Sequence, residues 1–214
     1  MSLTSTKPAL RGYIHQEAFF FSLGACLILL AETKNNVELI GSSVYSFGLL
    51  FLFGMSAIYH RPHWPPNRRA LLKRFDHCAI FFLIAGTFTP VCLLGLPKAS
   101  GDHLLIVIWS AAFLGVIQSI FWVKAPKWMN GLIYICVGWL LLPYTMELKK
   151  SIGQTGLNLL FAGGITYTVG ALFYILKKPN LKPGIFGYHE LFHLMTVVAA
   201  CLHFAVIYKL CVTA

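Results

Sequence analysis

Residues 185–206 read IFGYHELFHLMTVVAACLHFAV, an apolar stretch that is long enough to cross a membrane and yet carries three histidines. His189 and His193 are four residues apart, so on a helix they lie on one face, about one turn from each other. Two imidazoles at this spacing can hold one metal ion, and HELFH fits the H-E-x-x-H pattern of zinc hydrolases. Because an ionisable residue inside a membrane is costly, the pattern favours a functional site with partners elsewhere in the chain.

The composition indicates an integral membrane protein. Of the 214 residues, 57% are hydrophobic and 11% are charged, whereas soluble globular proteins carry about 25% charged residues. The net charge of +10 comes from basic residues in short loops between apolar runs. That distribution is typical of membrane topology and lipid headgroup contact, so nucleic-acid binding is not expected. The six cysteines lie in apolar segments without a C-x-x-C spacing, which predicts neither disulfides nor a cysteine zinc site.

Seven apolar stretches are long enough to cross about 30 Å of hydrocarbon. They lie at residues 13–31, 38–60, 75–96, 103–123, 129–147, 156–177 and 185–211. Pro90 and Pro143 lie inside the third and fifth stretches, where kinks are expected. The sequence shows no internal repeat and no soluble domain. It therefore predicts a single all-α integral membrane domain over residues 1–214, built as a bundle of seven transmembrane helices.

Lysine and arginine are distributed unevenly between the two sides of this bundle. With the N-terminus inside, 12 of them fall in the inner segments, Lys124 among them, and 5 in the outer segments. Cytoplasmic loops carry the excess of positive charge in membrane proteins. The count therefore predicts a cytoplasmic N-terminus and a C-terminus outside.

Five polar residues from three spans then fall at one depth, near the cytoplasmic side. Ser56 and His60 end the second span, Asp76 opens the third, and His189 and His193 lie in the first turns of the seventh. A catalytic zinc site takes three protein ligands and keeps one position for water, so the three histidines are the predicted ligands of one zinc ion. Asp76 would hydrogen-bond that water or a ligand histidine, and Ser56, one turn before His60, would contact the same water. Zinc would lower the pKa of the water toward about 7.

Each residue also has an ordinary interpretation. His60 alone is typical of a helix end at the membrane interface, and Ser56 alone of packing between membrane helices. Asp76 alone could cap its helix or pair with Arg74. Glu190, the base of the soluble H-E-x-x-H pattern, points about 100° away from the histidine face.

The other histidines and one glutamate are expected to play smaller parts. His203 lies about 15 Å along the helix from His193, too far to share the ion, and is predicted to be a hydrogen-bonded core residue. His77 is expected to turn away from the Asp76 face, and His103 to lie in a loop. Glu17 could reach the site from the first span.

Three stretches, SAIYH (56–60), KRFDHCAIFFLIAGTFTP (73–90) and YHELFHLMTVVAACLHF (188–204), resemble the hemolysin III family, the bacterial branch of the progestin and adiponectin receptor group. The resemblance covers essentially all seven spans. It implies a seven-helix bundle in a bacterial inner membrane, with a zinc toward the cytoplasmic leaflet held by His60, His189 and His193, and with Asp76 and Ser56 beside the zinc's water. Alkaline ceramidases of the same superfamily hydrolyse a lipid amide with a similar site. The family usually opens its first span with Asn and His, whereas residues 12–24 read GYIHQEAFFFSLG.

Three functions are compatible with these features. The leading hypothesis is a membrane-embedded zinc-dependent hydrolase of a lipid amide or ester, in which Asp76 handles the proton. The second is a non-enzymatic receptor or regulator of membrane homeostasis, in which a structural zinc holds the second, third and seventh spans together. A transporter or channel is disfavoured because the polar residues gather at one level instead of lining a path. A membrane lipid is the expected substrate or ligand, and the sequence identifies neither that lipid nor a protein partner.

Overall fold

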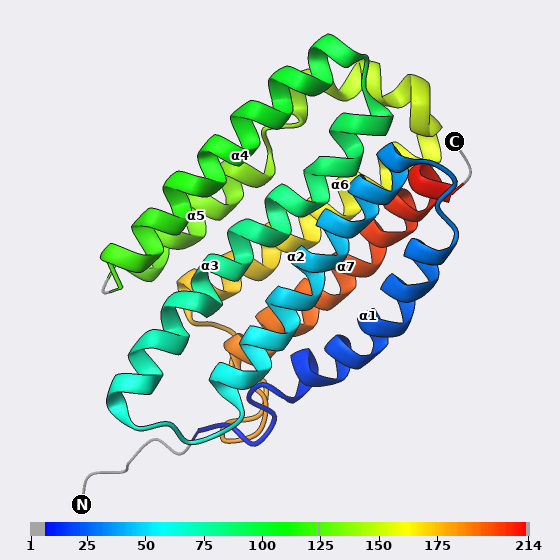
Figure 1. The fold of residues 1–214 in the computed structure, drawn as a ribbon. Helices are drawn as coiled ribbons and strands as arrows, with labels where there is room; N and C mark the ends of the chain where they lie inside the picture. The colour runs from blue at the N-terminus through cyan, green and yellow to red at the C-terminus, as the bar shows by residue number, and fades with distance from the viewer. Residues whose placement is uncertain (1–6, 124, 213–214) are drawn as a thin grey trace, which may run out of the picture.

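The computed structural model describes residues 7–123 and 125–212, which fold into helices without a β-strand. The α-helices are α1 (Tyr13–Ala31), α2 (Asn36–His60), α3 (Pro66–Pro90), α4 (Lys98–Phe121), α5 (Lys127–Gly138), α6 (Thr145–Leu176) and α7 (Tyr188–Val212). They pack side by side in one bundle, and α1 begins and α7 ends at opposite ends of it (Figure 1). The predicted all-α architecture is confirmed. Lys124, counted above among the inner basic residues, lies outside the described residues.

The structure has six candidate membrane spans, whereas the sequence predicts seven. The difference lies in one region, because the predicted spans 129–147 and 156–177 fall together in the single helical segment Lys127–Leu176. Within that segment α5 has only 12 residues. At 1.5 Å per residue such a helix is about 18 Å long, which is short of the roughly 30 Å of a hydrocarbon core. Hydropathy alone did not reveal that regular helix stops at Gly138.

Both prolines inside apolar stretches lie where regular α-helix gives way to another kind of helical turn. At Pro90 the α-helical pattern of α3 ends and a π-helical turn, η1 (Val91–Gly95), follows. Pro143 lies in the 3-10 turn η2 (Leu142–Tyr144) between α5 and α6. Proline has no N–H to donate to the preceding turn and its ring crowds the carbonyl there, so each helix changes its hydrogen-bonding pattern at this point.

Helices α3 and α4 begin earlier than the sequence predicts. α3 starts at Pro66, because proline is favoured at a first helical position and the arginines and lysines that follow are good helix formers in spite of their low hydropathy. Asp76 consequently lies in the third turn of α3 instead of opening it. α4 starts at Lys98, so His103 belongs to this helix and not to a loop, and its Nδ1 lies 2.6 Å from the Tyr144 hydroxyl.

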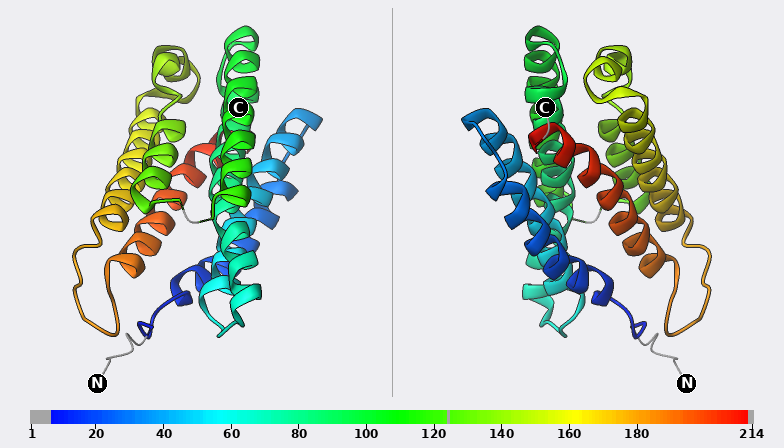
Figure 2. Two further views of the ribbon diagram at one scale, coloured as in Figure 1. Left: turned by 90° about the vertical axis from the view of Figure 1, so that its left-hand side faces the viewer. Right: turned by 90° about the vertical axis from the view of Figure 1, so that its right-hand side faces the viewer.

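The outer helices present apolar side chains to the surroundings, whereas α3 lies at the centre. Phe21 of α1 and Phe121 of α4 are 81% and 82% exposed, as expected for residues that face lipid. By contrast, 72% of the most apolar window of α3 is buried, against 22% for α1. α7 lies between α6 on one side and α1 and α2 on the other (Figure 2). The start of α7, with its two histidines, therefore lies inside the bundle.

Glycines allow α2 and α3 to approach closely. A Cβ at Gly48 would lie 2.7 Å from the carbonyl oxygen of Phe82, and a Cβ at Gly86 would lie 3.0 Å from that of Val44. Small residues at helix contacts are the usual means by which membrane helices come close. This contact sets the spacing between the helix that ends in His60 and the helix that carries Asp76.

We expect Gly48→Ala to lower the free energy of unfolding by about 1–3 kcal/mol, because the new methyl group would overlap backbone atoms that cannot move aside. Gly24→Ala on α1 is the matched control, since a Cβ there meets nothing within 4 Å. It should be neutral or stabilise by about 0.5–1 kcal/mol. Thermal unfolding midpoints in detergent check the pair. Equal midpoints for the two variants would show that the α2–α3 contact is not as close as described.

Candidate metal centre

The three predicted ligand histidines meet at one point of the bundle. His60 is the last residue of α2, and His189 and His193 lie in the first two turns of α7. Their ring nitrogens lie within 4.8 Å of one another, and all three side chains are buried. The Nε2 atoms of His60 and His189, which are 129 residues apart in sequence, are separated by 3.3 Å. The cluster predicted from sequence spacing and membrane depth is thus brought together.

This geometry suits a bound metal ion. Zinc binds an imidazole nitrogen at about 2.0–2.1 Å, so two ligands of a tetrahedral zinc lie about 3.3 Å apart. The separation of the two Nε2 atoms in the structure is the same. Three neutral nitrogen donors are also the ligand set of known catalytic zinc sites. Because imidazole equally suits copper, iron and nickel, the donor set by itself indicates a transition metal without naming it.

Asp76 reaches the cluster from α3. Its Oδ2 lies 3.7 Å from Nε2 of His60, and its side chain is 14% exposed. A carboxylate at this distance offsets the charge of a cation held by the histidines and can hydrogen-bond a water beside it. Arg74, considered above as its partner, forms no ion pair with Asp76 among the described residues. The structure therefore brings the predicted carboxylate to the edge of the ligand cluster.

Ser56 and His15 form a second contact beside the ligands. Ser56 is buried one turn before His60, and its Oγ lies 2.8 Å from Nδ1 of His15 on α1. The His15 ring stacks on His193, with ring centroids 3.9 Å apart and planes 5° from parallel. Sequence reasoning did not assign His15, because no local spacing connects residues 41 positions apart. Glu17, expected as a possible neighbour of the site, is exposed instead.

Glu190 is engaged elsewhere. Its side chain is 1% exposed, and one carboxylate oxygen accepts a hydrogen bond from the guanidinium of Arg11. The other oxygen accepts one from the backbone N–H of Gly187, 2.9 Å away. With both oxygens occupied by the N-terminal segment and the loop before α7, Glu190 anchors the start of α7. This arrangement agrees with the prediction that it points away from the histidine face.

The segment before α1 closes this end of the cluster. The backbone N–H of Ala9 donates to the carbonyl of Gly184, which ties the segment to the loop before α7. Gly12 has φ 84°, and a Cβ there would lie 2.8 Å from Cβ of His60. The left-handed backbone and the close approach both require glycine at this position.

Positive charge gathers at the same end. Burial lowers the pKa of Lys7, and the nearby Arg69, Arg11 and Arg61 lower it further because their charges repel the ammonium group. Lys7 Nζ donates to the carbonyl oxygen of Arg61, 2.9 Å away. Only one of these cations, Arg11, forms an ion pair among the described residues.

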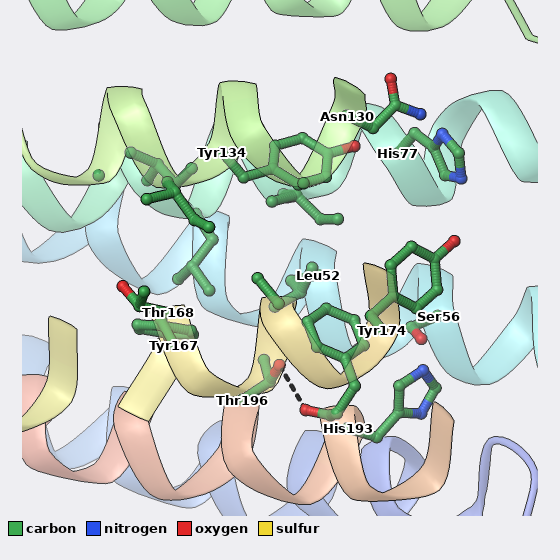
Figure 3. A pocket seen from close by; sticks show the side chains of 18 of the residues that line it. Leu52, Ser56, His77, Asn130, Tyr134, Tyr167, Thr168, Tyr174, His193 and Thr196 are labelled. Carbon is green, nitrogen blue, oxygen red and sulfur yellow. Dashed lines mark hydrogen bonds between the residues drawn. The ribbon is translucent and has the colours of Figure 1, made fainter. Parts of the chain in front are cut away.

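A cavity of about 140 Å³ extends from the cluster into the bundle, and its walls are mostly apolar. Figure 3 shows His193 and Ser56 together on one side of it, and Tyr134 and His77 on the other. His77 thus lines the same cavity as Asp76, although the sequence suggested that it turns away. Farther along α7, His203 Nε2 lies 3.1 Å from the carbonyl oxygen of Leu160, as expected for a hydrogen-bonded core residue.

Comparison with known proteins identifies relatives over almost the whole chain. The profile of the family described as Haemolysin-III related matches residues 3–204. The chain is 32% identical over 193 residues to Hemolysin-3 of Bacillus cereus, which covers 89% of this chain and 85% of that protein. A Hemolysin-3 homolog of Bacillus subtilis (strain 168) is 35% identical over 153 residues, or 71% of each chain. The Monocyte to macrophage differentiation factor of Homo sapiens is 26% identical over 179 residues, or 80% of this chain and 71% of that protein.

Proposed function

The chain belongs to the haemolysin III family, and on that premise we propose that it is a membrane-embedded, zinc-dependent hydrolase of a lipid amide or ester. The observation that carries this proposal is a buried three-histidine cluster with a carboxylate beside it, at the end of an apolar cavity. Zinc bound by these residues would supply a Lewis acid and bring the pKa of a water toward about 7. The surrounding side chains would transfer the protons and bind the substrate.

Asp76 is the group that we expect to take the proton from the attacking water and return it to the leaving atom. Its Oδ2 is 3.7 Å from a ligand nitrogen, so a water within hydrogen-bonding reach of the carboxylate also lies near the cluster. Ser56 lines the same cavity, and a hydroxyl has one donor and two acceptor positions. Its contact with His15 therefore leaves Ser56 free to hydrogen-bond the same water. His15, stacked on His193, would hold that ring in place.

The apolar cavity supports a lipid as the substrate. A fatty acyl chain lying along its walls would bring the carbonyl group to the polar end, where the histidines, Asp76 and Ser56 meet. Enclosing the carbonyl in an apolar cavity keeps bulk water away and strengthens the electrostatic interactions of the site.

We propose that the chain lies in a bacterial inner membrane with its N-terminus in the cytoplasm and its C-terminus outside. The excess of basic residues on the side of His60 supports this orientation. The metal centre would then open toward the cytoplasmic leaflet, so the substrate would enter from that side.

A second candidate is a membrane receptor or regulator in which zinc is structural. The observation that favours it is that the ligands connect α2 with α7, so one ion would hold two helices together. In that case removal of zinc would lower the unfolding midpoint, and no lipid would be consumed with or without the metal.

Metal removal tests the proposed activity. We expect the purified protein in nanodiscs to hydrolyse members of a panel of fatty amides and esters, followed by mass spectrometry of the released fatty acid. A chelator should abolish the release, and one equivalent of zinc should restore it, because in this proposal the zinc lowers the pKa of the attacking water. A zinc-loaded, folded protein that consumes no member of the panel would favour the structural role.

A further inference from the structure

Two lysines beside the polar end of the cavity donate hydrogen bonds to neutral groups of the described residues. Lys73 Nζ donates to the carbonyl oxygen of Val123, 2.9 Å away, and Lys127 Nζ donates to the hydroxyl of Tyr188 at 3.4 Å. Neither lysine forms an ion pair with a carboxylate of the described residues. Both are half-buried, so their charge is screened by water less than that of a lysine in bulk solvent.

Lys127 lies close to the metal centre. Its Nζ is 4.5 Å from the ring centroid of Tyr174, and that centroid is 5.5 Å from the ring centroid of His189. The ammonium group is therefore at most 10.0 Å from the ligand ring. It also stands at the first residue of α5, where the positive end of a helix dipole adds to its charge.

Lys73 adds its charge to the same side. It interacts electrostatically with Lys127 and Arg69 and, among the carboxylates of the described residues, with Asp76. Asp76 also lies beside His60, so its negative charge is shared between Lys73 and the metal-ligand cluster. This edge of the cavity consequently has a surplus of positive charge, even before a metal cation is bound.

The wall between the lysines and the metal ligands carries further hydrogen-bonding groups. His77, Tyr134 and Tyr174 all line the cavity, and the phenol groups of Tyr134 and Tyr174 point toward the side on which His77 lies (Figure 3). The Tyr134 hydroxyl is buried and has no hydrogen-bond partner among the described residues. Since a buried hydroxyl rarely stays unpaired, it indicates a place for a polar group of a ligand.

We propose that this edge of the cavity, lined by Tyr134 and His77 with Lys73 and Lys127 beside it, binds an anionic group carried on the leaving side of the substrate. The substrate class is then a fatty amide of an amino acid, with a carboxylate a few bonds from the amide. In such a molecule the amide carbon and the carboxyl carbon are about 4 Å apart or less, so both groups fit within the span from the ligand histidines to Lys127. This inference rests on the proposed hydrolase function.

The reaction with such a substrate is simple hydrolysis. The amide C–N bond breaks, the oxygen of the attacking water remains on the acyl carbon, and a proton from that water passes to the leaving nitrogen. The products are a fatty acid and a free amino acid. The lysines hold the carboxylate throughout and take no part in proton transfer.

The test compares two ligands that share an acyl chain and an amide. N-oleoylglycine carries a carboxylate where N-oleoylethanolamine carries a hydroxyl. We expect the wild-type protein, in nanodiscs of neutral phosphatidylcholine, to bind N-oleoylglycine about tenfold or more tightly, as measured by displacement of a fluorescent fatty amide. Lys127→Gln and Lys73→Gln should each reduce this preference severalfold without changing the affinity for N-oleoylethanolamine. The unfolding midpoint and zinc content of both variants should match those of the wild type.

Lys178→Gln is the matched control, because Lys178 is an exposed lysine in the loop before α7. It removes the same charge near the same end of the bundle and should leave the preference unchanged. Equal affinities for the two ligands, binding of neither, or a preference that survives in Lys127→Gln/Lys73→Gln would overturn the inference. A preference without hydrolysis of either ligand would instead contradict the proposed activity and leave the anion site standing.

Discussion

Asp76→Asn is expected to lower the turnover of a lipid amide or ester by about 10²- to 10⁴-fold, the usual contribution of a general base. Asparagine keeps the size of the side chain and its ability to hydrogen-bond, but it cannot accept a proton at neutral pH. Because the three histidines remain in place, the variant should retain its zinc and its unfolding midpoint. The measurement is the release of fatty acid under saturating substrate, with zinc content determined on the same sample.

Asp102→Asn provides the control for this experiment. Asp102 is an exposed aspartate on α4 that pairs with Lys98 one turn earlier, and its replacement should leave turnover unchanged. Turnover by Asp76→Asn at the wild-type rate would remove Asp76 from the mechanism. Loss of zinc from Asp76→Asn would show instead that the carboxylate is needed to hold the metal.

Replacing both His189 and His193 by alanine is expected to reduce the bound zinc from about one ion per chain to almost none. A single histidine, His60, would remain, and one imidazole cannot hold a zinc ion against water and buffer. Turnover should disappear with the metal. Elemental analysis of detergent-purified protein, expressed per chain, provides the measurement.

His203→Ala is the control within the same helix. His203 is a further histidine of α7, but it bonds to the Leu160 carbonyl and stands about 15 Å from the cluster. This variant should keep its zinc. Zinc retained by the double variant, or lost equally from His203→Ala, would contradict the assignment of the ligands.

The ligand histidines could be predicted because two independent patterns converge. The four-residue spacing of His189 and His193 is a local property of one helix, and the depth of His60 follows from its distance to the end of an apolar run. Asp76 was found in the same way, although α3 begins earlier than hydropathy suggests. The depth of a residue in the membrane can be estimated from its position in an apolar run. Here that depth was sufficient to predict that four side chains, the three histidines and Asp76, lie together.

What was missed depends on contacts across the bundle. The pairing of His15 with Ser56 and that of Arg11 with Glu190 depend on how helices rotate and cross, and no spacing within one helix encodes that. The structure has six candidate spans instead of the predicted seven for a related reason. The stretch around Pro143 is as apolar as a spanning helix, and only the geometry shows that α5 ends at Gly138.

The measurement that tests the central claim most directly is X-ray absorption at the zinc edge of the purified wild-type protein. The account predicts three imidazole nitrogens at about 2.0–2.1 Å and one oxygen from water in the first coordination sphere. That result would establish both the three-histidine site and the water-occupied coordination position that a zinc hydrolase needs. A folded protein without zinc, or a zinc closed by four protein ligands, would contradict it.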